Sequence, residues 1–573
     1  MFLKKSTRKN TGRTHLTIAQ GYWDSKNKRS KTKTVKVIGY LDELLNEYDD
    51  PIAHFTEMAK SMNETAVNER LINFQIASDE LVDKTIVNRK NYGHIVFSKI
   101  YHELEIDRFL NNKRRHENFM FNSESIMRLL LFGRLLYPNS KKKTFEIRDK
   151  FFDNFKFTLD DIYESLTHYD KISTDMQHFI HAKVSEQYKR DTSLIYYDVT
   201  NFYFEIDLED DFRKRGASKE KRHDPIVQMG LAVDKQSIPI AYDLFPGNTH
   251  DSQTLMPAMQ KIKKKYGAER IVVVADKGLN SGDNIAFNTV LGDGYIFSKS
   301  VRGASEEFKQ WILSETDYKE GKEYKRKSRI LPTKIEVTVA RQGKKKIKKT
   351  VVLDQKHIVL YSEQYAKRSR IKRQQLLEKA VDLIENPSKY RKATSYGAAS
   401  YIKNIKFDKT TGEVIESAEN IFLDLEKIKE EAKYDGYYAI ITSELDEPDD
   451  NIIEAYHGLW KIEESFKITK STLDAQPIFL QTRNHINAHF LICFLALLII
   501  RLVEIRLGNK YNASKIIETL RQVECSHITE NHYLFNFANE LTDDINTTFN
   551  TQIGKKTMTL GEIKKNLGLA KKS

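Results

Sequence analysis

The sequence predicts an α/β fold, and three features support this prediction. The segments SLIYYDVT (193–200) and IVVVAD (271–276) are short, nearly continuous apolar runs, which is typical of strands buried at the centre of a sheet. Strand-like and helix-like segments alternate between and after them. A length of 573 residues with 40% hydrophobic residues is enough for three or four packed domains.

Charge and cysteine content narrow the class of protein. The formal net charge of +13 favours a polyanionic partner, nucleic acid first and an anionic membrane surface second, although such a charge also serves solubility. The two cysteines, Cys493 and Cys525, are too few for a disulfide framework or a zinc site and fit a reducing cytoplasm. The basic start of the chain lacks the apolar run of a signal peptide, and the apolar run at 490–500 is too short to span a bilayer. We therefore expect a cytoplasmic protein with a buried helix there and no membrane partner.

The first third of the chain divides into a β-rich part and a helical part. Residues 1–45 alternate as strands do, which predicts a small basic β module, and ERLINFQIASDELV (69–82) adds one more strand or a linker before residue 89. Residues 90–190 carry apolar residues at helical spacing. This helical domain, with its basic loop NSKKKTF (139–145), suits DNA binding or dimerisation and is equally compatible with a plain structural bundle.

The centre of the predicted sheet lies at 191–300. Its segments read in order as three strands, a helix, a strand, a helix and a strand. The two most apolar strands each end in an aspartate, Asp198 and Asp276. Because open α/β sheets place their sites at the C-terminal ends of strands, these carboxylates are candidates for one site. Taken singly, either aspartate is explained as the cap of a following turn or helix.

Residues 301–435 interrupt this alternation of strands and helices, and the predicted core continues at 436–508. The interruption predicts a β-rich basic insertion with a lysine-dense turn, RQGKKKIKK (341–349). That turn suits contacts with a nucleic-acid backbone and is equally compatible with a solvated loop. A polar tail with helical periodicity follows at 509–573.

One stretch, IEAYHGLWKIEESFKITKST (453–472), predicts a helix near the end of the core. Tyr456, Glu463 and Lys470 are seven residues apart and therefore project from one helical face. A solvated charged face with coincidental spacing explains the helix taken alone. Asp198 and Asp276 supply the partners that a helical glutamate would need.

Together the three acidic residues predict an oxygen-only magnesium site. Asp198, Asp276 and Glu463 offer the carboxylates that Mg²⁺ prefers, and two such ions activate a water or hydroxyl and stabilise the leaving oxygen of a phosphodiester. A zinc site is not expected, because no His/Cys cluster has ligand spacing. The polar residues near the strand ends are expected to shape loops: Asn201, Asn248, Asp251 and Asn280.

At these motifs the chain resembles the DDE transposases of bacterial insertion sequences, in the group with a Tyr-x2-Arg-x3-Glu-x6-Lys pattern. Tyr456, Glu463 and Lys470 match that pattern, and Leu459 stands where it has arginine. YYDVTNFYFE and VVVADKGLNSGDN resemble the segments around the family's two aspartates. RGASKEKRHDPIVQMGLAVD and IPIAYDLFPGNTHDSQTL resemble the segments between them.

The resemblance implies an RNase H-like catalytic core, a mixed sheet flanked by helices and interrupted by a mainly β insertion. It implies Mg²⁺-dependent cleavage at transposon ends, with Mn²⁺ as a substitute, and attack of the freed 3′-hydroxyl on target DNA. Asp198, Asp276 and Glu463 take the roles of catalytic residues and metal ligands. The implied partner is double-stranded DNA, as terminal inverted repeats and as target, bound by a homodimer.

The basic residues of the helix are the implied DNA contacts. Tyr456 and Lys470 follow the family pattern. At Leu459, either Lys467 or Lys461 replaces the missing arginine or that contact is absent, and Lys467 is preferred because it lies one turn from the glutamate. Two other functions stay open: an RNase H-like endonuclease without strand transfer, and a domesticated DNA-binding protein without catalysis.

Overall fold

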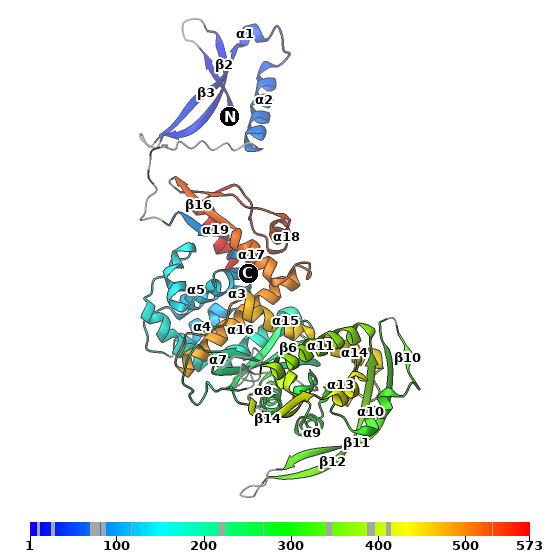
Figure 1. Cartoon of the computed structure of the whole chain (residues 1–573). Helices are drawn as coiled ribbons and strands as arrows, with labels where there is room; N and C mark the ends of the chain where they lie inside the picture. The colour runs from blue at the N-terminus through cyan, green and yellow to red at the C-terminus, as the bar shows by residue number, and fades with distance from the viewer. Residues whose placement is uncertain are drawn as a thin grey trace. The chain divides into compact units, whose positions relative to one another are not determined.

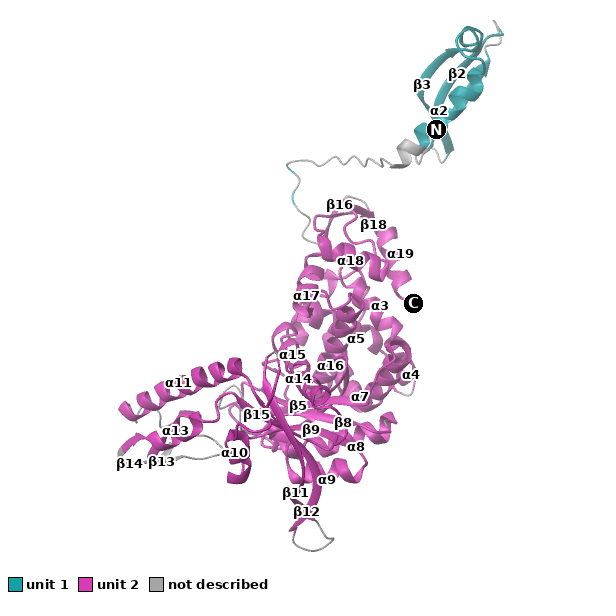
Figure 2. Ribbon diagram, turned by 90° about the vertical axis from the view of Figure 1, so that its right-hand side faces the viewer, with its two compact units in different colours: residues 1–84 teal, residues 85–573 magenta. Residues whose placement is uncertain are grey.

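The computed structural model describes the chain (Figure 1) except for residues 8–11, 25–28, 69–78, 80, 82–86, 116, 217–223, 268, 322, 340–345, 387–395, 408–413, 530 and 573. Two compact units, Met1–Lys84 and Thr85–Ser573, make up the chain (Figure 2). Most of the strand or linker expected at 69–82, and most of the lysine-dense turn, lie outside the described residues.

The first unit is a three-stranded antiparallel sheet covered by a helix. Its elements are β1 (Phe2–Thr7), β2 (Thr14–Asp24), β3 (Arg29–Tyr40), α1 (Leu41–Leu44) and α2 (Pro51–Asn68), with β2 in the middle of the sheet. Leu16 and Ile18 of β2 are buried, as are Phe55 and Ala59 of α2. The sequence analysis missed α2 in a stretch rich in polar residues. A spacing of four between its buried residues is enough to seat a helix on a sheet.

Nine of the described strands form one mixed sheet in the second unit. They are β5 (Leu194–Tyr203), β6 (Ile226–Asp234), β7 (Pro239–Pro246), β8 (Val272–Ala275), β9 (Gly294–Lys299), β10 (Lys319–Glu320), β11 (Lys325–Val339), β12 (Ile347–Tyr361) and β15 (Tyr437–Thr442). Their order across the sheet is β10-β11-β12-β15-β9-β8-β5-β6-β7. β5, β8 and β9 run parallel, and the other neighbouring pairs are antiparallel. The expected α/β class is confirmed.

The two faces of this sheet belong to two different cores, because side chains alternate along a strand. On β5, Tyr196 and Phe202 pack into the large core that contains the long helices, whereas Tyr197 faces a second core. The second core is closed by α8 (Leu255–Tyr266) and α9 (Gly282–Val290). Alternate residues of β5 are therefore locked to opposite faces.

The large core contains helices from two parts of the chain, one before the strands of the sheet and one after them. Before the sheet come α3 (Ile95–Glu103), α4 (Ile106–Arg114), α5 (Ser123–Leu136), α6 (Lys141–Glu146) and α7 (Leu159–Tyr188), and near the end of the chain comes α16 (Arg483–Arg506). α16 packs against α7, α5 and α3. By length and composition α16 could cross a membrane, but 94% of its most apolar window is buried inside the protein, which fits the buried helix expected at 490–500.

The insertion enlarges the sheet and adds helices. Besides β10, β11 and β12 it contains α10 (Glu306–Leu313), α11 (Glu363–Glu385), α12 (Tyr396–Ala399), α13 (Leu425–Ala432) and the separate two-stranded sheet of β13 (Ile402–Phe407) and β14 (Val414–Leu423). β12 pairs with β15, so the insertion continues the sheet without a break.

The C-terminal tail contains strands as well as helices, so the prediction of a helical tail is wrong in part. Its elements are α17 (Ala513–Gln522), β16 (Glu524–Thr529), β17 (His532–Phe535), α18 (Glu540–Phe549), β18 (Thr557–Thr559) and α19 (Leu560–Ala570). β16 pairs with β4 (Arg89–Asn91), at the other end of the unit. Pairing partners so distant in the sequence leave no local periodicity to detect.

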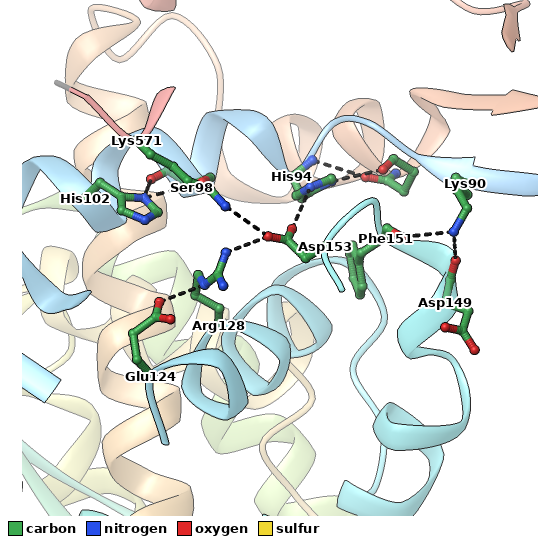
Figure 3. Close-up of polar contacts among 11 residues, drawn as sticks. Lys90, His94, Ser98, His102, Glu124, Arg128, Asp149, Phe151, Asp153 and Lys571 are labelled. Atoms are coloured by element: carbon green, nitrogen blue, oxygen red, sulfur yellow. Dashed lines mark hydrogen bonds and ion pairs between the residues drawn. The ribbon is translucent and has the colours of Figure 1, made fainter. Parts of the chain in front are cut away.

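A buried carboxylate joins three segments of the helical part (Figure 3). Asp153 Oδ1 lies 2.5 Å from Arg128 Nη1 and 3.2 Å from Lys571 Nζ, and Oδ2 lies 3.5 Å from His94 Nε2. Burial alone would raise the pKa of Asp153, but the hydrogen bond from His94 and the neighbouring positive charges hold that pKa well below its usual range. The ionised carboxylate therefore ties α3, α5 and the C-terminus together.

Replacing Asp153 by Asn removes the carboxylate that joins His94, Arg128 and Lys571, while Arg128 keeps its pair with Glu124, so we expect a loss of about 1.5–3 kcal/mol of stability. Because its pKa is lowered by folding, this contribution is full at neutral pH and fades as the pH falls below about 4. Urea unfolding of the variant should show a lower midpoint at pH 7 and a weaker loss of stability on acidification than wild type. Asp149→Asn is the control, since Lys90 binds the Asp149 carbonyl rather than its carboxylate. Equal midpoints for wild type and Asp153→Asn would contradict the role of the network.

Candidate active site

The two aspartates lie on adjacent parallel strands, but only Asp276 follows the end of its strand, β8; the expectation that a strand ends at Asp198 is wrong, because β5 continues to Tyr203. β5 and β8 pair with Tyr196 opposite Val274, so two residues further on Asp198 stands opposite Asp276. The backbone of Asp276 is still extended (φ −78°, ψ 170°), which carries the register past the end of β8. Because neighbouring strands are about 4.8 Å apart, the two aspartates lie side by side at the C-terminal end of β8, Asp198 half-buried and Asp276 exposed.

A tyrosine and a serine stand beside the second aspartate. The Ser298 hydroxyl of β9 donates to Asp276 Oδ1 at 2.7 Å. Burial raises the pKa of Tyr456 to about 12; a hydrogen bond with Ser298 opposes the rise, and the charges of Asp276 and Glu463 add to it. Both carboxylates thus lie close enough to act on one phenol, which stays protonated at neutral pH.

Three consecutive helical segments replace the single helix expected at 453–472. They are α14 (Asp449–His457), α15 (Trp460–Lys467) and a π-helical turn, η5 (Ile468–Thr472). The break falls at Gly458, where an added Cβ would overlap the Tyr196 hydroxyl. The prediction of one continuous helix is wrong, because Gly458 and Leu459 form a turn between α14 and α15 at the close approach to β5.

The segments α15 and η5 run along the face of β5 that carries Asp198. At one end Lys461 Nζ lies 5.4 Å from the centre of the Tyr196 ring. At the other end Lys470 Nζ lies 5.3 Å from the centre of the Phe202 ring. The two aromatic residues and Asp198 alternate onto the same face of the strand.

This contact sets the position of the helical glutamate. Glu463 lies between the two lysines in the chain, as Asp198 lies between the two aromatic residues, so the helix passes Asp198 near Glu463. Glu463 is exposed. The adjacent Glu464 instead pairs with the buried Arg501 of α16 at 2.9 Å. Glu464 therefore has a structural partner, and Glu463 is the better candidate for the site.

The basic candidates for DNA contact occupy different positions. Lys467 is exposed one turn after the glutamate, and Lys470 covers the end of β5. Lys461 donates its Nζ to the Lys235 carbonyl at 2.7 Å, in the turn between β6 and β7. Since that turn lies at the opposite end of β5, Lys461 is not brought to the acidic edge. Leu459 packs against the large core.

A third aspartate also lies at this edge. An added Cβ on Gly278 would stand 3.5 Å from Asp251 Oδ2, so the Asp251 carboxylate lies beside the turn that follows Asp276. Burial raises the pKa of Tyr197, and the charges of Asp198 and Asp251 are among those that add to the rise. The motif FPGNTHD carried a signal for Asp251, whereas nothing in the sequence singles out Ser298.

The donors suit a hard cation, but they are not a preformed cluster. Asp198, Asp276 and Glu463 offer oxygen donors only, which is the chemistry of magnesium rather than zinc sites. Within the part of the chain that the structure describes, no three Asp, Glu, His or Cys side chains stand close enough together to hold a metal ion.

Fold and site together define a protein whose mixed sheet presents paired aspartates at one edge beside a helix with an exposed glutamate. The family model for a transposase DDE domain matches residues 189–499, more than half of the chain. The chain therefore belongs to the DDE transposases of insertion sequences. Residues 3–72 also match the model for the N-terminal domain of IS1634 family transposases.

Solved structures of other transposases resemble parts of the chain. A piggyBac transposase synaptic complex with hairpin DNA matches at 8% identity and a TM-score of 0.35, covering 75% of this chain and 78% of that one. A Mos1 transposase paired-end complex with the left transposon end matches at 10% identity and a TM-score of 0.14, covering 44% and 70%. A search of curated proteins found none that matches.

The contact at Gly458 gives a direct test of the helix placement. Gly458→Ala forces a Cβ onto the Tyr196 hydroxyl, which we expect to cost about 1–3 kcal/mol of stability and to shift α15. Tyr196→Phe removes the overlapping oxygen, so the double variant should recover part of the loss. A double-mutant cycle in thermal unfolding measures this coupling. Strictly additive effects would contradict the described contact.

Proposed function

We propose that this transposase cleaves DNA at transposon ends and joins the freed 3′-hydroxyl to target DNA at the edge formed by β5, β8 and α15. The observation that carries the proposal is the register that places Asp198 opposite Asp276. The helix with Glu463 crosses the same face of β5. Asp198, Asp276 and Glu463 come from three distant segments of the chain, and a DNA-binding protein without catalysis does not need these carboxylates together.

An RNase H-like core is part of this proposal. Its support is the arrangement of the first five strands of the sheet. β5 lies in the middle, β6 and β7 follow antiparallel on one side, and β8 and β9 lie parallel on the other. Helices cover both faces. In that core the C-terminal edge of the parallel strands is open to a ligand.

Asp198, Asp276 and Glu463 would hold Mg²⁺, with Mn²⁺ as a substitute. When bound, two such ions supply Lewis-acid charge to the scissile phosphate and lower the pKa of an attacking water or 3′-hydroxyl. The protein fixes the aspartate pair through the β5–β8 register. It restrains Asp276 through the Ser298 hydroxyl. Glu463 completes the set from a helix anchored by Gly458 on β5.

The neighbouring residues would receive DNA. The Tyr456 phenol, protonated at neutral pH, can donate to a phosphate oxygen beside Asp276. Lys467 is exposed next to Glu463 and Lys470 ends the same ridge, so both offer positive charge to the DNA backbone. Lys461 is the weakest candidate, because its Nζ is held by the Lys235 carbonyl. Two DNA ends must be held together, so we propose a homodimer on DNA, acting at the nucleoid in the cytoplasm.

Labelled DNA with candidate terminal inverted repeats separates this function from its alternatives. Incubation with Mg²⁺ should give cleaved ends and joined products, and EDTA should abolish both. Cleavage without joining would identify an endonuclease. A metal-independent mobility shift without cleavage would identify a DNA-binding protein and overturn the proposal.

Conservative variants test the three residues one at a time. Asp198→Asn, Asp276→Asn and Glu463→Gln should each lower cleavage at least about a hundredfold, because each removes charge worth several kcal/mol to the transition state. DNA affinity should change little. The matched control is Glu454→Gln, an exposed carboxylate on α14. A variant with wild-type cleavage would remove its residue from the site.

A further inference from the structure

A small cavity lies beneath the segment that follows the catalytic helix. Its volume is about 170 Å³, and it opens between the end of α5, the start of α6, residues 474–480 and α16. Arg134, Lys141 and His489 line it, and all three are buried. Lys141 belongs to the basic segment 139–145, and the proposed active site uses no residue of that segment.

Lys141 has little to neutralise its charge. Its Nζ lies 3.2 Å from His489 Nδ1, and His489 Nε2 lies 3.0 Å from the Ala475 carbonyl. A carbonyl only accepts, so Nε2 carries the hydrogen and Nδ1 accepts from the ammonium. Burial, with the charge of Arg134, lowers the pKa of Lys141 to about 7. Among the described residues no carboxylate forms an ion pair with Lys141, and two of its N–H groups have no acceptor.

Arg134 brings a second charge to the same cavity. Its Nη1 donates to the carbonyls of Leu473 and Asp474 at 3.1 and 2.8 Å, and its Nη2 donates to the Asn139 carbonyl at 3.1 Å. These three bonds leave two of the five guanidinium hydrogens unused. Neutral carbonyls do not cancel the charge, and the Asp474 side chain is exposed.

Two buried cations at a cavity whose acidic lining residue, Asp474, has an exposed side chain are costly unless an anion joins them. The cavity is larger than a monatomic ion requires and admits a tetrahedral oxyanion. Lys142, the next residue in the chain, is exposed and does not line the cavity. The positive charge, the N–H groups without an acceptor and the volume of the cavity all favour a tetrahedral oxyanion as the ligand.

We propose that this cavity is a phosphate-binding site in which Lys141 and Arg134 hold a phosphate group. The group is a backbone phosphate of DNA or free inorganic phosphate. Arg134 also donates hydrogen bonds to the carbonyls of Leu473 and Asp474. The bound phosphate therefore stabilises the end of η5, which follows α15 and carries Lys470. The site is separate from the acidic edge, and its existence does not depend on the chemistry proposed there.

Thermal unfolding of the full-length protein in phosphate and in chloride of equal ionic strength tests the site. Wild type should gain about 3 °C in midpoint, saturably, when phosphate exceeds its Kd a hundredfold. Lys141→Met should fold, since an apolar chain replaces an uncompensated charge, and it should lose this gain. Lys142→Met, an exposed neighbour, should keep it. No gain in wild type, or an equal gain in Lys141→Met, would overturn the proposal.

A second test uses the wild-type protein alone, so its result does not depend on whether the Lys141→Met variant folds. Reductive methylation followed by mass spectrometry reports the reactivity of each lysine. Phosphate should protect Lys141 at least about threefold and leave Lys142 unchanged, because direct contact blocks the amine. Equal reactivity of Lys141 with and without phosphate would refute the site.

The salt dependence of DNA binding distinguishes the two sources of phosphate. If a DNA phosphate enters the cavity, Lys141→Met should lower the slope of log affinity against log salt by about one relative to Lys142→Met. An equal slope, together with lost phosphate stabilisation, would assign the site to free phosphate. None of these tests measures DNA cleavage. A protein without the proposed transposase activity could therefore still show phosphate binding at this cavity, and the two proposals are tested separately.

Discussion

The parallel pairing of β5 with β8 is the constraint on which the site depends. It sets Tyr196 opposite Val274, and continuing that register by two residues brings Asp198 beside Asp276. A slip of one residue would turn one aspartate to the opposite face of the sheet. The register is protected because both faces of β5 are packed into cores, so every residue of the strand is committed to one side.

The helix that completes the site is held from two directions. Gly458 lets the chain approach Tyr196 closely enough to place α15 on β5. From the other side, Arg501 of the buried helix α16 pairs with Glu464 at 2.9 Å and with Glu504 at 2.8 Å. One glutamate of the adjacent pair therefore anchors the helix, which leaves Glu463 exposed for function. Anchoring the helix and presenting a carboxylate are thus separate tasks of neighbouring residues.

Much of the core could be predicted from the sequence because its signals are local. The apolar runs ending in Asp198 and Asp276 fall on strands, and the expected α/β class is observed. What escaped prediction depends on distant partners. The break at Gly458 exists because of Tyr196, the strands of the tail exist because β16 pairs with β4, and Ser298 gains its role only by lying next to Asp276. The spacing to Tyr456 and Lys470 already selected Glu463, whereas the pairing of Glu464 with Arg501 is visible only in the structure.

The central claim is that β5, β8 and α15 deliver their carboxylates to one metal site. Replacing Mg²⁺ by Fe²⁺ in the DNA-bound protein, with ascorbate and peroxide, generates hydroxyl radicals at the metal that cut the nearby backbone. The account predicts three sets of fragments, from cuts close to Asp198, Asp276 and Glu463, all suppressed by excess Mg²⁺. Cuts confined to one of these segments, or located elsewhere in the chain, would contradict it.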